Sequence, residues 1–580
     1  MRSLLILALS FFIITCTPPK QDESIDRLVV RLKNDPDRVN PLLHATSISR
    51  EVYQYVMLMM GEQNPKTLEF DPLLIKELPK AVEIEEGLDK GKYAYNFELL
   101  PDVTWTDGSP VTAEDYLFTL KLIYHKGLNL AGYKAVYSKI INSFTIDDSN
   151  PKKFTIITSQ PDENDVITLC GVEVYPIQYY DPNNVMLKYS LEDLLDESKY
   201  EEQVKMDPNL AEFAIQFQEA KYSREVVEGA GPYKLTAWES DQFIRLERKE
   251  NYWGENYPHQ LPLKAYPKEI IFQIVEDDVI AINQLSGGEM DVATLQSTTG
   301  ERFLELKEDK LLSSKYNFYT PQLARYLYIQ LNNESPFLSD KRVRKAVAHL
   351  IDVDRLIEVV EGGVGSRVTS IISNKRPYFN ADLKPIQFDI EKAKSLLTKA
   401  GWTDTNNNGT VDKVINGELT EMKMRLHTSS SALSQRLSLT MKEGAASVGI
   451  DLELITQSFR ITKPQNLETG DFEMTPMMAT HSPIDKPFHY WHSSQIGGKG
   501  LNLTRYSNPV VDKIIEEMET ENNEIKKNVL FKTLQQVIYD DHAILMLYAP
   551  VEKIVVSKRF DPLISSRKPG YFANAFKPVE

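Results

Sequence analysis

The segment from residue 477 to residue 502, MMATHSPIDKPFHYWHSSQIGGKGLN, holds a dense set of side chains that could carry out chemistry. It contains three histidines, one aspartate, a tyrosine and a tryptophan within 26 residues. Three histidines could ligate a metal ion, but His489-Tyr-Trp-His492 has no cysteine or Glu-x-x-His partner at a zinc-like spacing. Aromatic rings with a few polar groups also line pockets for small molecules. The spacing therefore favours a polar and aromatic lining over a metal centre.

A second polar segment, residues 404–412 (DTNNNGTVD), has the spacing of an EF-hand type calcium loop. Four residues match positions 1, 3, 5 and 6 of such a loop: Asp404, Asn406, Asn408 and Gly409. Position 12 is Ile415, so the usual bidentate carboxylate is missing, and Asp412 at position 9 could replace it. The alternative is a plain turn before a hairpin that closes at Asn416-Gly417. Calcium is the one cofactor that the sequence suggests.

The sequence lacks the motifs of the common hydrolases. It has no Gly-x-Ser-x-Gly segment and no His-Glu-x-x-His segment. Cys170, in TLCGVEVYP, has no catalytic residues around it, and we expect a buried, inert side chain. The 83 acidic residues guarantee that carboxylate pairs occur somewhere, so composition alone does not exclude a glycosidase. We predict a protein that is not an enzyme and keep a secreted hydrolase as the alternative.

The amino-terminal segment MRSLLILALSFFIITC predicts export and a lipid anchor. One arginine precedes an apolar run that is shorter than the roughly 20 residues of a membrane-spanning helix. The run ends in Ile-Ile-Thr-Cys16, which is similar to the bacterial lipoprotein signal, where the cysteine is acylated and becomes the first residue of the mature chain. Thr15 departs from that pattern, and the alternative is a plain secretory signal. We predict a signal peptide at 1–15, an anchor at Cys16 and a polar tether at 16–26.

Length and charge limit the class of protein further. The chain has 580 residues, of which 42% are hydrophobic and 26% charged, which is typical of a globular protein with two to four domains. The formal net charge is −17 and no long Lys/Arg tract occurs, so we expect no nucleic-acid partner. No apolar stretch after the leader approaches membrane-spanning length.

Helix and strand signals alternate along the rest of the chain. Residues 27–32 (RLVVRL) and 93–99 favour strands, the second through strict alternation. Residues 113–124 favour a helix, with Thr112 as its N-cap and two acidic residues in its first turn. Residues 178–228 favour a helical insertion at the surface. Such alternation predicts an α/β fold with mixed sheets.

One stretch, VTWTDGSPVTAEDY (103–116), resembles the signature of a known family nearly position for position. That family is the extracellular solute-binding proteins of family 5, which includes the oligopeptide-, dipeptide- and nickel-binding components of ABC importers. Other motifs of the family are spread along the chain in the family's order: Asp35-Pro36, Gly229 to Tyr233, Asn251 to Gly254, Leu285 to Asp291, Asp340 to Ala346 and Ser507 to Pro509. Each also has an ordinary structural role, such as the turn at Asp107-Gly108, so we interpret them as markers of the fold.

The resemblance implies a periplasmic binding protein-like class II fold, with two lobes around a ligand cleft and an extra third domain. Lobe I would comprise residues 27–66, 229–300 and 532–580. The extra domain II would comprise residues 67–228, and the opposite lobe III residues 301–531. In such a fold the ligand is buried when the lobes close.

The resemblance also indicates which residues line the cleft. They come from three segments far apart in the sequence: Thr46, Arg325, Asn332, His481, Asp485, Tyr490, Trp491 and Asn502. In many peptide-binding members an aspartate of the last segment receives the α-ammonium of the peptide, because a buried cation needs a paired charge. This chain has Thr480 in place of that aspartate. Asp485 is the remaining acidic side chain of the segment, and it could take the role.

The function that the resemblance implies is that of a substrate-binding lipoprotein of an ABC importer. Such a protein captures a small solute, here expected to be a peptide, and delivers it to permease subunits in the membrane. We expect a monomer, held by Cys16 at the periplasmic or extracellular face of the cell envelope. Because the usual aspartate is missing, a sugar or a metal chelate stays an alternative ligand.

Overall fold

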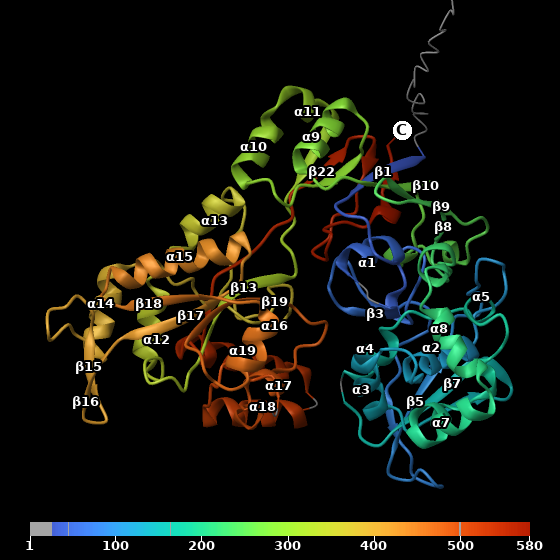
Figure 1. Cartoon of the computed structure of the whole chain (residues 1–580), viewed down its shortest axis with the longest axis horizontal. Helices are drawn as coiled ribbons and strands as arrows, with labels where there is room; N and C mark the ends of the chain where they lie inside the picture. Colours follow the sequence, from blue (N-terminus) through green and yellow to red (C-terminus); the bar gives the residue numbers. More distant parts are fainter. Residues whose placement is uncertain (1–25, 44–45, 163, 498–499, 522, 580) are drawn as a thin grey trace, which may run out of the picture.

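The computed structural model describes residues 26–43, 46–162, 164–497, 500–521 and 523–579, and it has two halves joined at one side (Figure 1). Lobe I and domain II form one half, and lobe III forms the other. The predicted signal peptide and Cys16 lie outside the described residues. In the described part of the chain, no helix is long and apolar enough to cross a membrane.

Lobe I is built on a seven-stranded sheet. In spatial order its strands are β12 (Tyr316–Tyr319), β22 (Ile554–Ser557), β11 (Val292–Thr294), β1 (Arg27–Leu32), β10 (Glu269–Ile274), β9 (Phe243–Arg248) and β8 (Tyr233–Glu239). The predicted strand 27–32 is confirmed as β1, which lies in the middle of the sheet and runs parallel to β10. Four helices belong to this lobe: α1 (Ser47–Tyr53), α9 (Asp278–Gly287), α10 (Gly300–Glu308) and α11 (Lys310–Lys315).

Domain II has a four-stranded antiparallel sheet. Its strands, in spatial order, are β4 (Ala81–Glu83), β5 (Tyr93–Glu98), β7 (Asn150–Thr158) and β6 (Ser143–Asp147). Phe97 and Phe154 stack between β5 and β7 with ring centroids 4.7 Å apart. The predicted helix 113–124 is confirmed as α2 (Ala113–Tyr124), and the Asp115 carboxylate accepts a hydrogen bond of 2.9 Å from the Thr112 amide in a capping box.

The remaining helices of domain II pack into the core that it shares with lobe I. They are α3 (Ala131–Ile140), α4 (Asp165–Cys170), α5 (Ile177–Tyr180), α6 (Leu191–Leu195), α7 (Glu197–Met206) and α8 (Asn209–Phe217). The insertion 178–228 is helical as predicted, but α8 buries Phe213 and Phe217 in that core. Cys170 is fully buried, as expected, and burial raises the pKa of its thiol.

Lobe III is built on a five-stranded sheet in the order β18 (Asp451–Thr456), β17 (Lys423–Thr428), β19 (Met474–Thr480), β13 (Arg325–Leu331) and β20 (Ile544–Met546). One core, which contains Ile329 and Leu331, lies under α12 (Lys341–Ala348), α14 (Ile390–Lys399) and α15 (Ala432–Ala446), close to α13 (Val353–Glu361). Tyr328 and Met546 pack against a second core, which lies under α17 (Pro487–Trp491), α18 (Pro509–Thr520) and α19 (Glu524–Asp540). The hairpin of β15 (Asp412–Ile415) and β16 (Glu418–Glu421) projects from the edge of this lobe (Figure 1).

Two segments belong to a different lobe from the one that the resemblance implied. Residues 301–319 belong with lobe I, because α10 and α11 bury Phe303 and Leu312 in its core and β12 pairs with β22. Residues 532–546 belong with lobe III, because β20 pairs with β13. The two crossing segments run side by side, since the Leu323 amide donates to the Pro550 carbonyl at 3.1 Å. These two segments connect the two halves of the chain.

Candidate functional site

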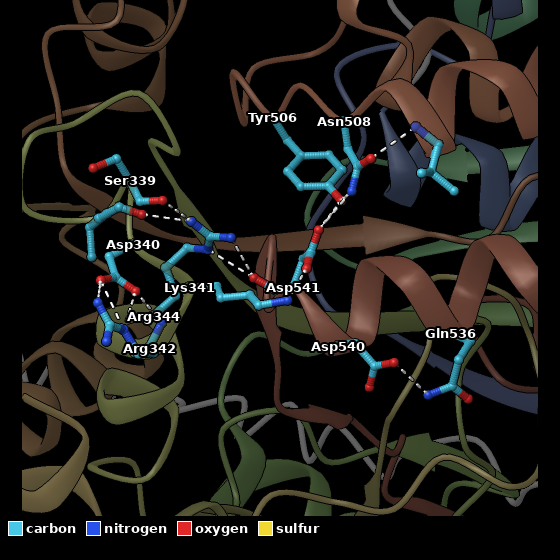
Figure 2. A network of polar contacts seen from close by, with 12 residues as sticks. Ser339, Asp340, Lys341, Arg342, Arg344, Tyr506, Asn508, Gln536, Asp540 and Asp541 are labelled. Atoms are coloured by element: carbon cyan, nitrogen blue, oxygen red, sulfur yellow. Dashed lines mark hydrogen bonds and ion pairs between the residues drawn. The ribbon is translucent and has the colours of Figure 1, made fainter. Parts of the chain in front are cut away.

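Two of the motifs that resemble the family meet at the end of α19 (Figure 2). The Asp541 carboxylate accepts hydrogen bonds from the Tyr506 hydroxyl at 2.7 Å and the Asn508 amide at 2.8 Å, and pairs with Lys341 at 3.1 Å. The Arg344 guanidinium donates to the Asp541 backbone carbonyl at 2.6 and 2.9 Å. These contacts fasten α12 and the start of α18 to the end of α19. They agree with the interpretation of these motifs as markers of the fold.

A cavity of about 480 Å³ lies over β13 and β19, on the side that faces α17. Its wall includes Tyr326, Tyr328 and Gln330 from β13, which alternate with Leu327, Ile329 and Leu331 of the core on the other face. Register places Tyr326 opposite Ala479 and Tyr328 opposite Met477 on the neighbouring strand. The segment 480–491 closes the cavity, and Asn164 of domain II reaches its rim. The predicted segment therefore does form a pocket, with β13 as its back wall.

Aromatic rings form one part of this wall. The Tyr326 and Tyr328 rings lie 5.6 Å apart, and the His481 ring lies 4.9 Å from Tyr326. Tyr490 is 52% exposed at the opening, whereas Trp491 is 6% exposed and packs edge-on against Tyr506. A concave aromatic surface of this kind binds apolar and aromatic groups.

Asp485 lies on the cavity wall with its charge already paired. Its carboxylate accepts a hydrogen bond of 2.8 Å from the Tyr378 hydroxyl, and the Arg376 guanidinium lies 3.4 Å away. Burial raises the pKa of Asp485, and the contacts with Tyr378 and Arg376 oppose that shift. Arg376 also donates to the Ser482 carbonyl at 2.9 Å, so the same guanidinium holds the loop in place. A role for Asp485 in binding an α-ammonium stays a prediction, and the ammonium would have to share the carboxylate with Arg376.

Two other ionisable groups of the wall, His481 and Lys486, add no free charge. Burial, together with the nearby Arg376 charge, lowers the pKa of His481 to about 4, so its imidazole is neutral at neutral pH. Lys486 forms an ion pair with Asp162 of domain II. A second hollow of about 380 Å³ lies beside this pair, between Pro161 of domain II and Phe531 of lobe III. The pair therefore connects the two halves of the molecule next to the cavity.

Four of the eight predicted cleft residues come together around the cavity: His481, Asp485, Tyr490 and Trp491. The other four lie outside its lining. Thr46 caps α1, where its hydroxyl accepts from the Ser49 amide, and Arg325 reaches the Met478 sulfur at 3.6 Å. Asn332 and Asn502 are buried and donate to backbone carbonyls, Asn332 to Phe472 and Asn502 to Tyr506. Their binding roles stay predictions.

Sequence reasoning placed the stretch from Arg325 to Asn332 at the cleft but singled out only its two ends. Tyr326, Tyr328 and Gln330 could have been singled out from the alternation of the strand RYLYIQL, in which one face is aromatic or polar and the other aliphatic. Arg376 and Tyr378 carry no such signal, because they lie in an irregular segment more than 100 residues before Asp485. Their contact with it depends on the tertiary fold alone.

The segment 404–412 forms a turn before the β15–β16 hairpin. The Asp404 carboxylate accepts hydrogen bonds from the amides of Asn408 and Gly409, and the Asn406 side chain also accepts from Asn408. Asp412 is buried and accepts from the Thr405 hydroxyl at 2.7 Å. Among the described residues, no group of three or more His, Cys, Asp or Glu side chains is placed to hold a metal ion. Calcium binding here stays a prediction.

Comparisons with known proteins agree with this architecture. The profile of the bacterial extracellular solute-binding proteins, family 5 Middle, matches residues 80–500. The oligopeptide-binding protein AppA of Bacillus subtilis is 23% identical over 572 residues, which cover 94% of this chain and 92% of that protein. The nickel-binding periplasmic protein of Escherichia coli is 24% identical over 333 residues, which cover 57% of this chain and 60% of that protein.

The fold is also that of solved structures. The structure of AppA from Bacillus subtilis in complex with a nonapeptide superposes with a TM-score of 0.63 at 20% identity, covering 96% of this chain and 99% of that one. At this identity the likeness establishes the two-lobed fold.

Proposed function

Because this chain belongs to the bacterial extracellular solute-binding proteins of family 5, we propose that it captures peptides for delivery to an ABC permease. The observation that carries the proposal is the aromatic cavity of about 480 Å³, which opens between lobe III and domain II. Asp485 and Lys486 in its wall are paired within the protein and His481 is neutral, so it suits a neutral organic group better than an ion. Relatives that bind oligopeptides support the choice of a peptide.

The other ligands have less support. In the described part of the chain no cluster of metal-ligating side chains occurs, which argues against a bare metal ion. The relatives that match are binding proteins, so a hydrolase is not favoured.

Binding of a peptide is expected to close the two halves. A ligand at a hundredfold excess over its dissociation constant stabilises the folded state by about 2.7 kcal/mol. After the protein is incubated with mixed tetrapeptides and sugars, we expect native mass spectrometry to detect peptides bound to it. The retained peptide should raise the melting temperature and reduce the radius of gyration in small-angle scattering. Retention of sugars alone would refute the peptide, and a higher melting temperature with unchanged scattering would refute closure.

The lipid anchor is a further part of the proposal, and it rests on the sequence Ile-Ile-Thr-Cys16. One acyl chain holds a protein at a membrane only marginally, whereas two or more hold it stably. Protein from a bacterial host that processes lipoproteins should therefore begin at Cys16 and partition into the membrane fraction. Cys16→Ala should release it to the soluble fraction. Intact-mass analysis of the native protein decides the question, since an unmodified Cys16 would contradict the anchor.

A further inference from the structure

A row of polar side chains crosses the lobe III sheet beneath the cavity. Gln330 of β13 lies opposite Thr475 of β19. Leu426 of β17 pairs with Met474, so His427, one residue further along, continues the row beside Thr475. The three side chains are 3%, 4% and 2% exposed. Buried polar side chains on three adjacent strands are unusual on a face that the sheet buries, and they call for hydrogen-bond partners.

Gln330 and Thr475 lack such partners. Among the described residues, none forms a hydrogen bond with the Gln330 side-chain nitrogen Nε2 or with the Thr475 hydroxyl. Gln330 belongs to the cavity lining, and it stands on the same face of β13 as Tyr326 and Tyr328. Its amide therefore lies at the wall of the cavity with a nitrogen that has neither an acceptor nor contact with solvent. A turn about the last side-chain bond exchanges the amide nitrogen and oxygen, and it would present the nitrogen to a ligand that supplies the missing acceptor.

The surroundings limit what that ligand group can be. The Asp485 charge is paired with Arg376, and Lys486 is paired with Asp162. Burial lowers the pKa of His427, which keeps the far end of the row neutral at neutral pH. A charged group at the floor would find no counter-ion, so a neutral group is required. The aromatic side chains of the wall favour an aromatic ring in the ligand. The Gln330 amide nitrogen, as a donor, requires a hydrogen-bond acceptor at the far end of that ring.

We propose that this cavity is a subsite for a hydroxyl-bearing aromatic side chain of a bound peptide, with the Gln330 amide nitrogen donating to the hydroxyl oxygen at the cavity floor. The chemistry is that of a tyrosine side chain, and Gln330 is the specificity-determining residue. The proposal rests on the proposed peptide-binding function. It makes Gln330 the cause of a preference between two ligands that differ only by one oxygen atom.

The test uses pairs of alanine tetrapeptides that carry tyrosine or phenylalanine at each of the four positions in turn. Calorimetry on the mature protein should show, at one position, that the tyrosine peptide binds about tenfold tighter than its phenylalanine partner, as expected for one buried hydrogen bond. Gln330→Met should bring the two affinities to within about twofold. Gln330→Asn keeps a polar side chain but withdraws the donor, and it should have the same effect if the methionine variant does not fold.

A matched control is Gln216→Met on the exposed face of α8, which should keep the tenfold preference. The melting temperature of ligand-free Gln330→Met should stay level or rise, because the change removes an unpaired buried amide. Two results would overturn the subsite: no preference at any position of the native protein, or a preference that survives in both Gln330 variants. If no peptide binds at all, the proposed function falls together with the subsite.

Discussion

Arg31→Met is expected to lower the free energy of unfolding by about 3–5 kcal/mol, because it breaks a buried ion pair from one side. The Arg31 guanidinium lies 2.8 Å from the Asp278 carboxylate, and the two side chains are 1% and 7% exposed. The same guanidinium donates to the backbone carbonyls of Val275, Glu276 and Thr294 at 2.7–2.8 Å. Its removal leaves a buried carboxylate without its cation and three carbonyls without donors. Chemical denaturation followed by circular dichroism measures the loss.

Arg27→Met is the matched control for this prediction. Arg27 begins the same strand and pairs with Glu269 at 2.6 Å, but the two side chains are 29% and 19% exposed. An ion pair with this exposure contributes about 0–1 kcal/mol. The double variant Arg31→Met with Asp278→Asn should lose less than the two single variants together, because no charge is then left unpaired. Equal losses for Arg27→Met and Arg31→Met would contradict the argument.

Arg31 also illustrates where sequence reasoning on the fold ends. The strand RLVVRL could be predicted from its valines and leucines, but its alternation places Arg31 on the face opposite Leu28 and Val30, where solvent would be expected. In the structure β1 is a central strand whose last three residues are all buried, and Asp278 at the start of α9 supplies the counter-charge to Arg31. Strand order is a tertiary property, so the sequence of one strand does not reveal whether a charge on it is buried.

The boundaries of the lobes also depend on tertiary contacts that the local sequence does not reveal. The α/β class could be predicted from the alternation of helix and strand signals, and the two-lobed fold was implied by the resemblance of motifs such as VTWTDGSPVTAEDY to the family. The assignment of residues 301–319 and 532–546 to their lobes could not, since it depends on which sheet edge β12 and β20 complete. Edge pairing is decided by contacts between segments more than 200 residues apart in the sequence.

The candidate site was partly predictable for a related reason. His481, Asp485, Tyr490 and Trp491 lie close together in one segment, which the resemblance placed at the cleft and whose composition suits a binding site. The partners that change their chemistry come from elsewhere: Arg376 neutralises Asp485, and the walls of β13 supply the unpaired Gln330. Residue types could be predicted from the sequence, but the net charge of the cavity required the fold.

The protonation state of Glu51 on α1 also depends on the tertiary fold, because the fold buries its carboxyl group. Its side chain is buried, with the residue 6% exposed. Burial raises the pKa of Glu51 to about 8, the Lys568 charge opposes the shift, and the Glu552 charge adds to it. The folded protein therefore holds a proton on Glu51 at a pH where the unfolded chain has released it.

This proton makes the stability of the native protein fall as the pH rises from about 4.5 to about 8. Below pH 4.5 the carboxyl is protonated in both states, so the stabilisation is fully present, and it is lost as the pH passes through the folded-state pKa. Glu51→Gln cannot release a proton, so its stability relative to the native protein should rise over this range, by about 3–5 kcal/mol between pH 4 and pH 9. Denaturation of both proteins across this range measures the difference, with Glu358→Gln on the exposed face of α13 as a control that should stay flat. A constant difference between Glu51→Gln and the native protein at every pH would mean that the folded protein solvates or pairs this carboxylate as well as water does.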